Sequence, residues 1–142
     1  MSQYKARGNR NQNFQKPSNY FKKISVPLTT HYNNKEQIYL VDGIAYKKAE
    51  EFNRIPPHQL RKILQVCKES SADENFNEAK IKLFSAVPMA AYNAGRDGKL
   101  RGLYEFVVEN INENTIKTTE DIQLFNDLFT AIIAFHKSVY RG

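Results

Sequence analysis

Apolar residues recur every three or four positions through most of the sequence, which is the spacing of one face of an α-helix. No alternating strand pattern of useful length and no internal repeat is present. The pattern predicts an all-α protein, a single compact bundle of about five helices. The first helix is expected near residues 38–53, or from Asp42 onward if Gly43 shortens it, and the third from Asp73 through Val87 with a kink or division at Pro88. The second, after Pro56-Pro57, has an apolar face of Leu60, Ile63, Leu64 and Cys67. The fourth runs from Leu100 to Ile111, with an apolar face of Leu100, Leu103, Tyr104, Val107, Val108 and Ile111. The fifth runs from Thr118 to about Tyr140, with an apolar face that includes Ile122, Phe125, Leu128, Phe129, Ile132 and Val139.

Several residues mark where these helices begin and end. Asp73 is suited to cap the third helix, because its carboxylate can accept a hydrogen bond from a free backbone N–H. Thr118-Thr119-Glu120-Asp121 has the pattern of a capping box, which begins the fifth helix. Gly95 and Gly98 are expected in the left-handed conformation that closes a helix.

The N-terminal region differs from the rest in charge and in hydropathy. Residues 1–23 contain no acidic residue, and their six cations account for the whole net charge of +6. Few apolar residues are available for burial there, so we expect a basic tail that is disordered when free. Residues 24–35 are typical of a linker able to fold against the body. The predicted organisation is therefore a tail and linker over residues 1–35 and a helical bundle domain over residues 36–142.

A neutral body with a basic tail favours an acidic partner, either nucleic acid or a membrane surface. Aromatic residues alternate with the cations of the tail and could stack on bases, although a purely solubilising tail has the same composition. The membrane is the weaker alternative, because the tail has no helical apolar stripe. No segment approaches the roughly 20 apolar residues of a membrane span, and the N-terminus is not that of a secretory signal, so a cytoplasmic protein is expected.

No constellation for catalysis or metal binding is present in the sequence. The histidines His31, His58 and His136 are scattered and lack metal-ligand spacing, and Cys67 lies on an apolar stripe typical of a core thiol. His136 also falls on an apolar face, where a satisfied, buried histidine is expected. We predict no enzymatic activity, no metal and no cofactor. An enzyme would need one of the histidines to meet carboxylates in a cleft.

Cations of the body occur in two places where we expect ordered structure. One group follows the outward face of the second helix, and the other lies in the turn before the fourth helix, where backbone N–H groups could join as anion donors. They would form a track for phosphates if the fold brings them to one side, whereas the alternative is an ordinary solvated helix face. The candidates for phosphate contact are Arg54, Arg61, Lys62, Lys68, Arg96, Lys99 and Arg101.

The same two places carry a resemblance to the small helical subunit of type III-A CRISPR effector complexes (the Csm complexes). That family has a Leu/Ile-Thr-Thr-Ser-Gln-Leu-Arg-Lys-like stretch and a Pro-x-x-x-Tyr-x-Ala-Gly-Arg-like run, and the resemblance covers roughly residues 45–140. Pro56-Pro57-His58 replaces the hydroxyl residues of the first stretch. The matching segments are Arg54-Ile55-Pro56-Pro57-His58-Gln59-Leu60-Arg61-Lys62-Ile63-Leu64 and Pro88-Met89-Ala90-Ala91-Tyr92-Asn93-Ala94-Gly95-Arg96.

The resemblance implies a non-enzymatic subunit of a ribonucleoprotein, present in several copies. These copies would stack head to tail along the guide RNA–target RNA path and contact the large subunit and the backbone subunit, while cleavage belongs to other subunits. By motif position it implies RNA contacts for Arg54, Arg61, Lys62 and Arg96, whereas Lys68, Lys99 and Arg101 rest on helix geometry. The alternative is a helical protein–protein adaptor whose basic tail gives only non-specific nucleic-acid affinity.

Overall fold

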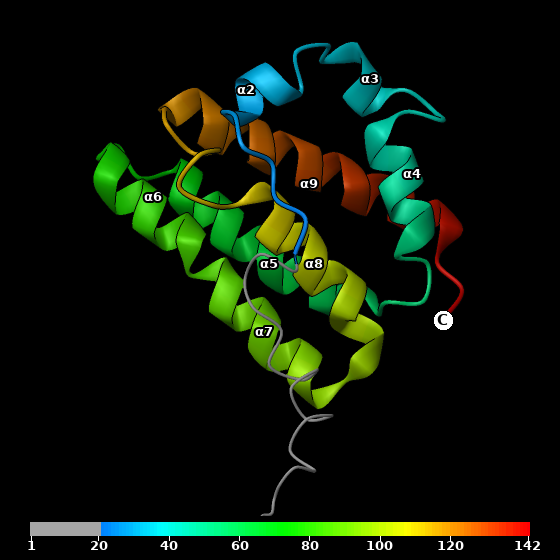
Figure 1. The fold of residues 1–142 in the computed structure, drawn as a ribbon. Helices are drawn as coiled ribbons and strands as arrows, with labels where there is room; N and C mark the ends of the chain where they lie inside the picture. The colour runs from blue at the N-terminus through cyan, green and yellow to red at the C-terminus, as the bar shows by residue number, and fades with distance from the viewer. Residues whose placement is uncertain (1–20) are drawn as a thin grey trace, which may run out of the picture.

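Helices joined by turns form the whole of the described chain in the computed structural model, which describes residues 21–142 (Figure 1). This range contains no strand, and none of its helices has the length and apolarity needed to cross a bilayer. The all-α prediction is therefore confirmed. The elements are α2 (Leu28–His31), α3 (Glu36–Tyr39), α4 (Ile44–Glu51), α5 (Pro57–Ser71), α6 (Phe76–Phe84), α7 (Ala86–Arg96), the 3-10 turn η3 (Gly98–Leu100), α8 (Arg101–Asn110) and α9 (Thr119–Val139).

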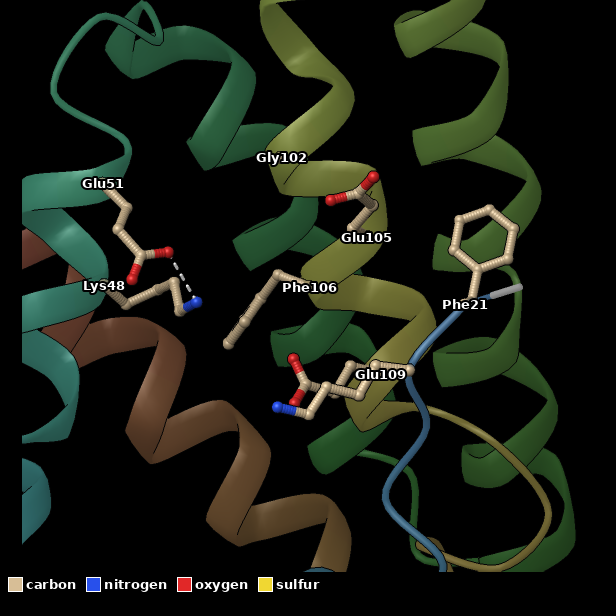
Figure 2. A pocket seen from close by; sticks show the side chains of 8 residues that line it. Phe21, Lys48, Glu51, Gly102, Glu105, Phe106 and Glu109 are labelled. Atoms are coloured by element: carbon tan, nitrogen blue, oxygen red, sulfur yellow. Dashed lines mark hydrogen bonds and ion pairs between the residues drawn. The ribbon is translucent and has the colours of Figure 1, made fainter. Parts of the chain in front are cut away.

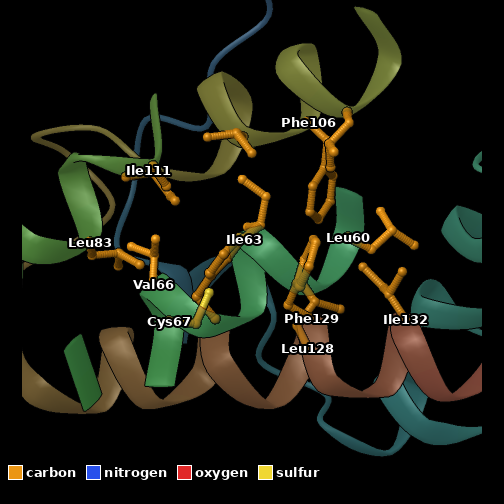
Figure 3. Packing of buried hydrophobic residues seen from close by; sticks show 14 of the residues in the cluster. Leu60, Ile63, Val66, Cys67, Leu83, Phe106, Ile111, Leu128, Phe129 and Ile132 are labelled. Carbon is orange, nitrogen blue, oxygen red and sulfur yellow. The ribbon is translucent and has the colours of Figure 1, made fainter. Parts of the chain in front are cut away.

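The central element is α9, whose apolar face is the predicted one. Phe125, Leu128, Phe129 and Ile132 are completely buried, and each contributes about 1.5–3 kcal/mol through burial. Helices α4 and α5 make the most extensive contacts with this face, and α2, α3 and α6 also pack on it. Figure 3 shows the side chains of α5 and α9 meeting around Cys67, which is buried as expected.

The carboxylate of Asp121 fixes the first turn of α9. Its Oδ2 accepts the backbone N–H groups of Lys117 (2.9 Å) and Thr118 (3.0 Å), and its Oδ1 accepts that of Thr29 (2.9 Å). The hydroxyl of Thr118 accepts the N–H of Asp121 in return, so the predicted capping box is present. Although burial favours the neutral acid, these N–H donors hold the pKa of Asp121 below its ordinary value. One carboxylate thus joins the start of α9 to α2.

Residues 24–35 lie against the body and add to its core. Ile24, Leu28 and Tyr32 are buried, and the hydroxyl of Tyr32 donates a hydrogen bond to Oδ1 of Asn110. The Leu28 N–H donates to the carbonyl of Thr115 at 3.0 Å. The packed body therefore begins before residue 36, the predicted start of the bundle domain.

The predicted basic tail falls mostly outside the described residues, which leave out residues 1–20. Phe21 is described and is half-buried rather than fully exposed. Its ring meets that of Tyr104 edge-on, with centroids 5.2 Å apart. The C-terminal end of the predicted tail therefore packs on α8.

The first predicted helix is divided in two, because a turn separates α3 from α4, and of the two predicted starts only the later one, at Asp42, falls near the start of α4 at Ile44. Asp42 has a φ of 70°, which no helix accommodates, and it forms part of this turn. Gly43 follows in close contact with the preceding turn, since a Cβ on it would lie 2.2 Å from the carbonyl oxygen of Gln37. The apolar spacing continued across the turn and concealed it.

Three helix ends differ in detail from the prediction. Asn75 rather than Asp73 caps α6, and its side chain accepts the N–H of Glu78 at 3.0 Å. The division expected at Pro88 falls at Ser85, because a proline lacking its N–H is tolerated in the first turn of α7. Neither Gly95 nor Gly98 has a positive φ. Instead, α7 ends where Asp97 becomes extended (φ −144°, ψ 108°).

We expect Asp121→Asn to lower the free energy of unfolding by about 2–3 kcal/mol at neutral pH, because an amide NH2 would then face backbone N–H donors. The stabilisation by this carboxylate is present above the ordinary Asp pKa of about 3.9 and is lost as the pH falls through the lowered folded pKa. Urea melts of the natural protein should therefore lose stability in acid more steeply than those of the variant. Glu113→Gln, at an exposed site, is the control and should change neither the free energy of unfolding nor its dependence on pH.

Candidate nucleic-acid interface

The fold brings the two signature segments together at one hollow between α5 and α7. Gln59 and Lys62 line it from α5, and Asn93 and Arg96 line it from α7. The hollow has a volume of about 230 Å³. Its position follows from packing, because the small buried residues of α7, Ala86 and Ala90, let that helix approach the body, and the polar residues of its last turn then lie beside α5.

The electrostatics of this hollow are mainly cationic. Among residues 21–142, neither Lys62 nor Arg96 has a carboxylate oxygen within 4.0 Å, and both side chains are exposed. The guanidinium of Arg96 lies over the Tyr92 ring, 5.7 Å from its centroid. Asp97 also lines the hollow and reduces its net positive charge. An ammonium and a guanidinium beside amide groups can hold the oxygens of a phosphate.

Polar groups of the hollow are also left without partners. The Oε1 atom of Gln59 is buried and accepts no hydrogen bond from any described residue. Its Nε2 atom lies 3.3 Å from Nε2 of His58, which is exposed as predicted. Gln59 and Asn93 are not among the candidates predicted from the sequence, although each lies three positions before a predicted cation on its helix.

The cations of α5 do not gather at one place. Arg61 lines a different hollow, at the junction of α5 and α9, and is not part of the group around Lys62. Lys68 is exposed farther along α5. Between them Gln65 donates to the carboxylate of Glu69 at 2.9 Å, so this helix face mixes charges of both signs.

The turn before α8 differs from the expected anion site. The N–H of Lys99 donates to Oδ1 of Asp97 at 3.0 Å, and the N–H groups of Leu100 and Arg101 donate to the carbonyls of Asp97 and Gly98. The prediction that these N–H groups bind an external anion is therefore wrong, because Asp97 already caps the turn. The Lys99 side chain remains exposed.

Arg101 is engaged within the chain, and Arg54 is not. The Nε of Arg101 lies 3.0 Å from Oε2 of Glu105, and its guanidinium lies over the rings of Phe21 and Tyr104. Arg54 is exposed in the turn between α4 and α5 and has no ion pair with any residue from 21 to 142.

The side of the body between α4 and α8 is acidic. A hollow of about 310 Å³ there is lined by the carboxylates of Glu51, Glu105 and Glu109, together with Lys22 and Lys48 (Figure 2). Lys48 pairs with Glu51 at 2.8 Å. The three carboxylates outnumber the two lysines, so this hollow suits an anion less well than the hollows lined by Lys62 and Arg61.

The residues considered for catalysis do not form a cluster in the described part of the chain. His136 is 2% exposed, and its Nε2 lies 3.0 Å from the carbonyl oxygen of Phe52, as expected of a satisfied core histidine. His31 is exposed on α2, far along the chain from the exposed His58 on α5. Residues 21–142 contain no group of three or more His, Cys, Asp or Glu able to hold a metal ion.

The fold defines the chain as a small, all-helical protein with exposed cations on α5 and α7. A family model described as Csm2 Type III-A matches residues 35–142, and the chain belongs to this family. It is thus a small subunit of the type III-A CRISPR Csm complex, as the two signature segments implied. Neither the curated proteins nor the solved structures contain a match to the sequence.

We expect Cys67 to be inert towards thiol reagents in the folded protein. Burial raises the pKa of this thiol to about 12, so the reactive thiolate is scarce at pH 8 and the sulfur is also inaccessible. Labelling with a chromogenic disulfide should be slow in buffer and complete within the time of unfolding in urea. Rapid labelling of the folded protein would mean that α5 and α9 separate readily.

Proposed function

We propose that the chain is a non-catalytic subunit that holds RNA by its phosphates in the assembled effector complex. Several copies stack along the guide RNA–target RNA path and contact the large subunit and the backbone subunit. The observation that carries the RNA-binding part is the meeting of Lys62 and Arg96 at one hollow, because each comes from a different signature segment. The family consists of structural small subunits, which supports the absence of catalysis.

Phosphate contacts suit a subunit that must accept any guide. Contacts to the RNA backbone fix position without reading sequence, and base pairing between guide and target supplies the specificity. Lys62 and Arg96 can make such contacts without first breaking an ion pair to another described residue. Arg54, Arg61, Lys68 and Lys99 are proposed as further contacts, and Arg101 as a weaker one because it is paired with Glu105.

We expect Lys62→Ala and Arg96→Ala each to weaken RNA binding by the assembled complex to a similar degree for unrelated RNA sequences. Each lost phosphate contact should lower the slope of log K against log salt by roughly 0.7–0.9. Both side chains are exposed, so stability should change by no more than about 0.5 kcal/mol. Binding isotherms at several salt concentrations measure the slope.

The matched control is Lys47→Ala, an exposed lysine on α4 that has no ion pair within residues 21–142. It removes the same charge at a distance from the hollow and should leave the slope unchanged. Equal slopes for the natural protein, Lys62→Ala and Arg96→Ala in a complex that assembles normally would refute the phosphate contacts.

Two exposed apolar patches support the stacking of copies. The loop patch consists of Tyr39, the last residue of α3, and Leu40 and Val41 in the turn that follows, which are 50%, 53% and 66% exposed. The left-handed Asp42 and the tightly packed Gly43 fix the shape of this turn. Exposed apolar side chains on a well-defined turn are typical of a protein contact.

A second set of exposed apolar side chains, called the rod patch, consists of Ile81 on α6 and Tyr92 on α7, which are 60% and 65% exposed. Figure 1 shows α3 and the α6–α7 rod at opposite sides of the body. When unlike surfaces of identical subunits meet, the contact repeats from copy to copy and forms an open array wherever the rotation between copies does not close a ring. Contact between the loop patch of one copy and the rod patch of the next would give such an array.

We expect Val41→Asp to reduce the number of copies of this subunit per complex, because a desolvated carboxylate would be placed at the contact between copies. Native mass spectrometry of reconstituted complexes gives the copy number. Val26→Asp makes the same chemical change at a site that is 39% exposed outside both patches, and it should leave the number unchanged. Full occupancy with Val41→Asp would exclude the loop patch from the contact.

A further inference from the structure

A second hollow, at the junction of α5 and α9, has a different character from the one between α5 and α7. Its volume is about 340 Å³, and it lies between the first turns of α5 and the end of α9. Arg61 is the one residue that it shares with the phosphate contacts proposed above, and two of its other residues, Lys137 and Tyr140, were not predicted from the sequence. The lining residues are Pro57, Leu60, Arg61, Ile133, His136, Lys137 and Tyr140.

The walls of this hollow combine an apolar surface, an aromatic ring and two cations. Leu60 is completely buried and Ile133 is half-buried, so this part of the lining is apolar. Arg61 and Lys137 are exposed, and neither has a carboxylate oxygen within 4.0 Å among residues 21–142. Tyr140 is 37% exposed and supplies the ring.

The aromatic wall is held in place from both sides. The ring of Tyr140 is inclined at 31° to that of His136, with centroids 5.2 Å apart. His136 is itself fixed by the contact of its Nε2 with the carbonyl of Phe52. The N–H of Arg141 donates to the carbonyl of Asn53 at 2.8 Å, which ties the backbone after Tyr140 to the turn before α5. A ligand that stacks here meets an ordered ring, although it must displace Gly142, on which a Cβ would lie 2.6 Å from Cε2 and Cζ of that ring.

We infer that this hollow binds one unpaired nucleotide of the RNA, with its base on the Tyr140 ring and its phosphate between Arg61 and Lys137. Stacking on an aromatic ring tolerates any base, so it adds affinity without sequence preference. A paired base is unavailable, because its faces are covered by its neighbours in the helix. The inference rests on the proposed function, since it requires this subunit to contact RNA. An acidic peptide would satisfy the cations but would leave the apolar and aromatic walls without a matching group.

The test uses complexes reconstituted with the full chain and RNA carrying a single 4-thiouridine, either unpaired or within a duplex. After irradiation, the cross-linked peptides are mapped by mass spectrometry. We expect the unpaired probe to cross-link to the peptide containing Tyr140, and the paired probe to do so severalfold less. Tyr140→Phe keeps the ring and should retain the cross-link, whereas Tyr140→Leu should lose most of it.

The salt slope and the cross-link yield distinguish a failure of the phosphate contacts from a failure of this inference. Lys62→Ala should lower the salt slope and leave the cross-link yield per bound RNA unchanged. If Lys62→Ala leaves the slope unchanged while the Tyr140 cross-link is retained, only the phosphate contact of Lys62 is refuted. The inference is overturned if both probes cross-link equally, if Tyr140→Leu has no effect, or if the end of α9 cross-links to a protein segment and not to RNA.

Discussion

Burial of the apolar face of α9 is the constraint on which the rest of the structure depends. Helices α4 and α5 pack on that face. Both ends of α9 are also fixed by polar contacts with residues from other parts of the chain. At its start, Asp121 accepts N–H groups from its own first turn and from Thr29. Near its end, His136 meets the carbonyl of Phe52. The position of α5, and with it the position of both cationic hollows, follows from this packing.

Most of the fold could be predicted because its helices are amphipathic and their buried residues repeat with the helical period. The predicted faces of α5, α8 and α9 are the buried ones, and Thr118 begins α9 as expected. The failures occur where the local backbone sets a boundary that the apolar spacing does not reveal. Gly43 interrupts a periodic stretch because its backbone lies against Gln37. Ser85 separates α6 from α7, although the apolar pattern continues past it. Pro88 does not mark this boundary, because a proline fits the first turn of α7.

The candidate site was predictable only in part, because helix periodicity identifies an exposed face but not its neighbour in space. Adjacent in sequence, Arg61 and Lys62 lead to different hollows. Arg101 is engaged by Glu105 and by the ring of Phe21, a residue assigned to the tail. Lys137 and Tyr140, which line the hollow at the end of α9, were not predicted. The available signal was a lysine in the last turn of the helix followed by an aromatic residue just after it.

The central place of α9 has a consequence for how the protein is made. Among the helices of residues 21–142, α9 is the last to leave the ribosome, yet it carries the face on which α4 and α5 pack. Until it emerges, the apolar sides of those earlier helices lack this partner and are more accessible to other nascent chains. Folding of this domain must therefore be completed after translation of its final helix, in contrast to domains whose N-terminal parts fold first. A ribosome-stalled chain lacking α9 is the species on which a chaperone would act.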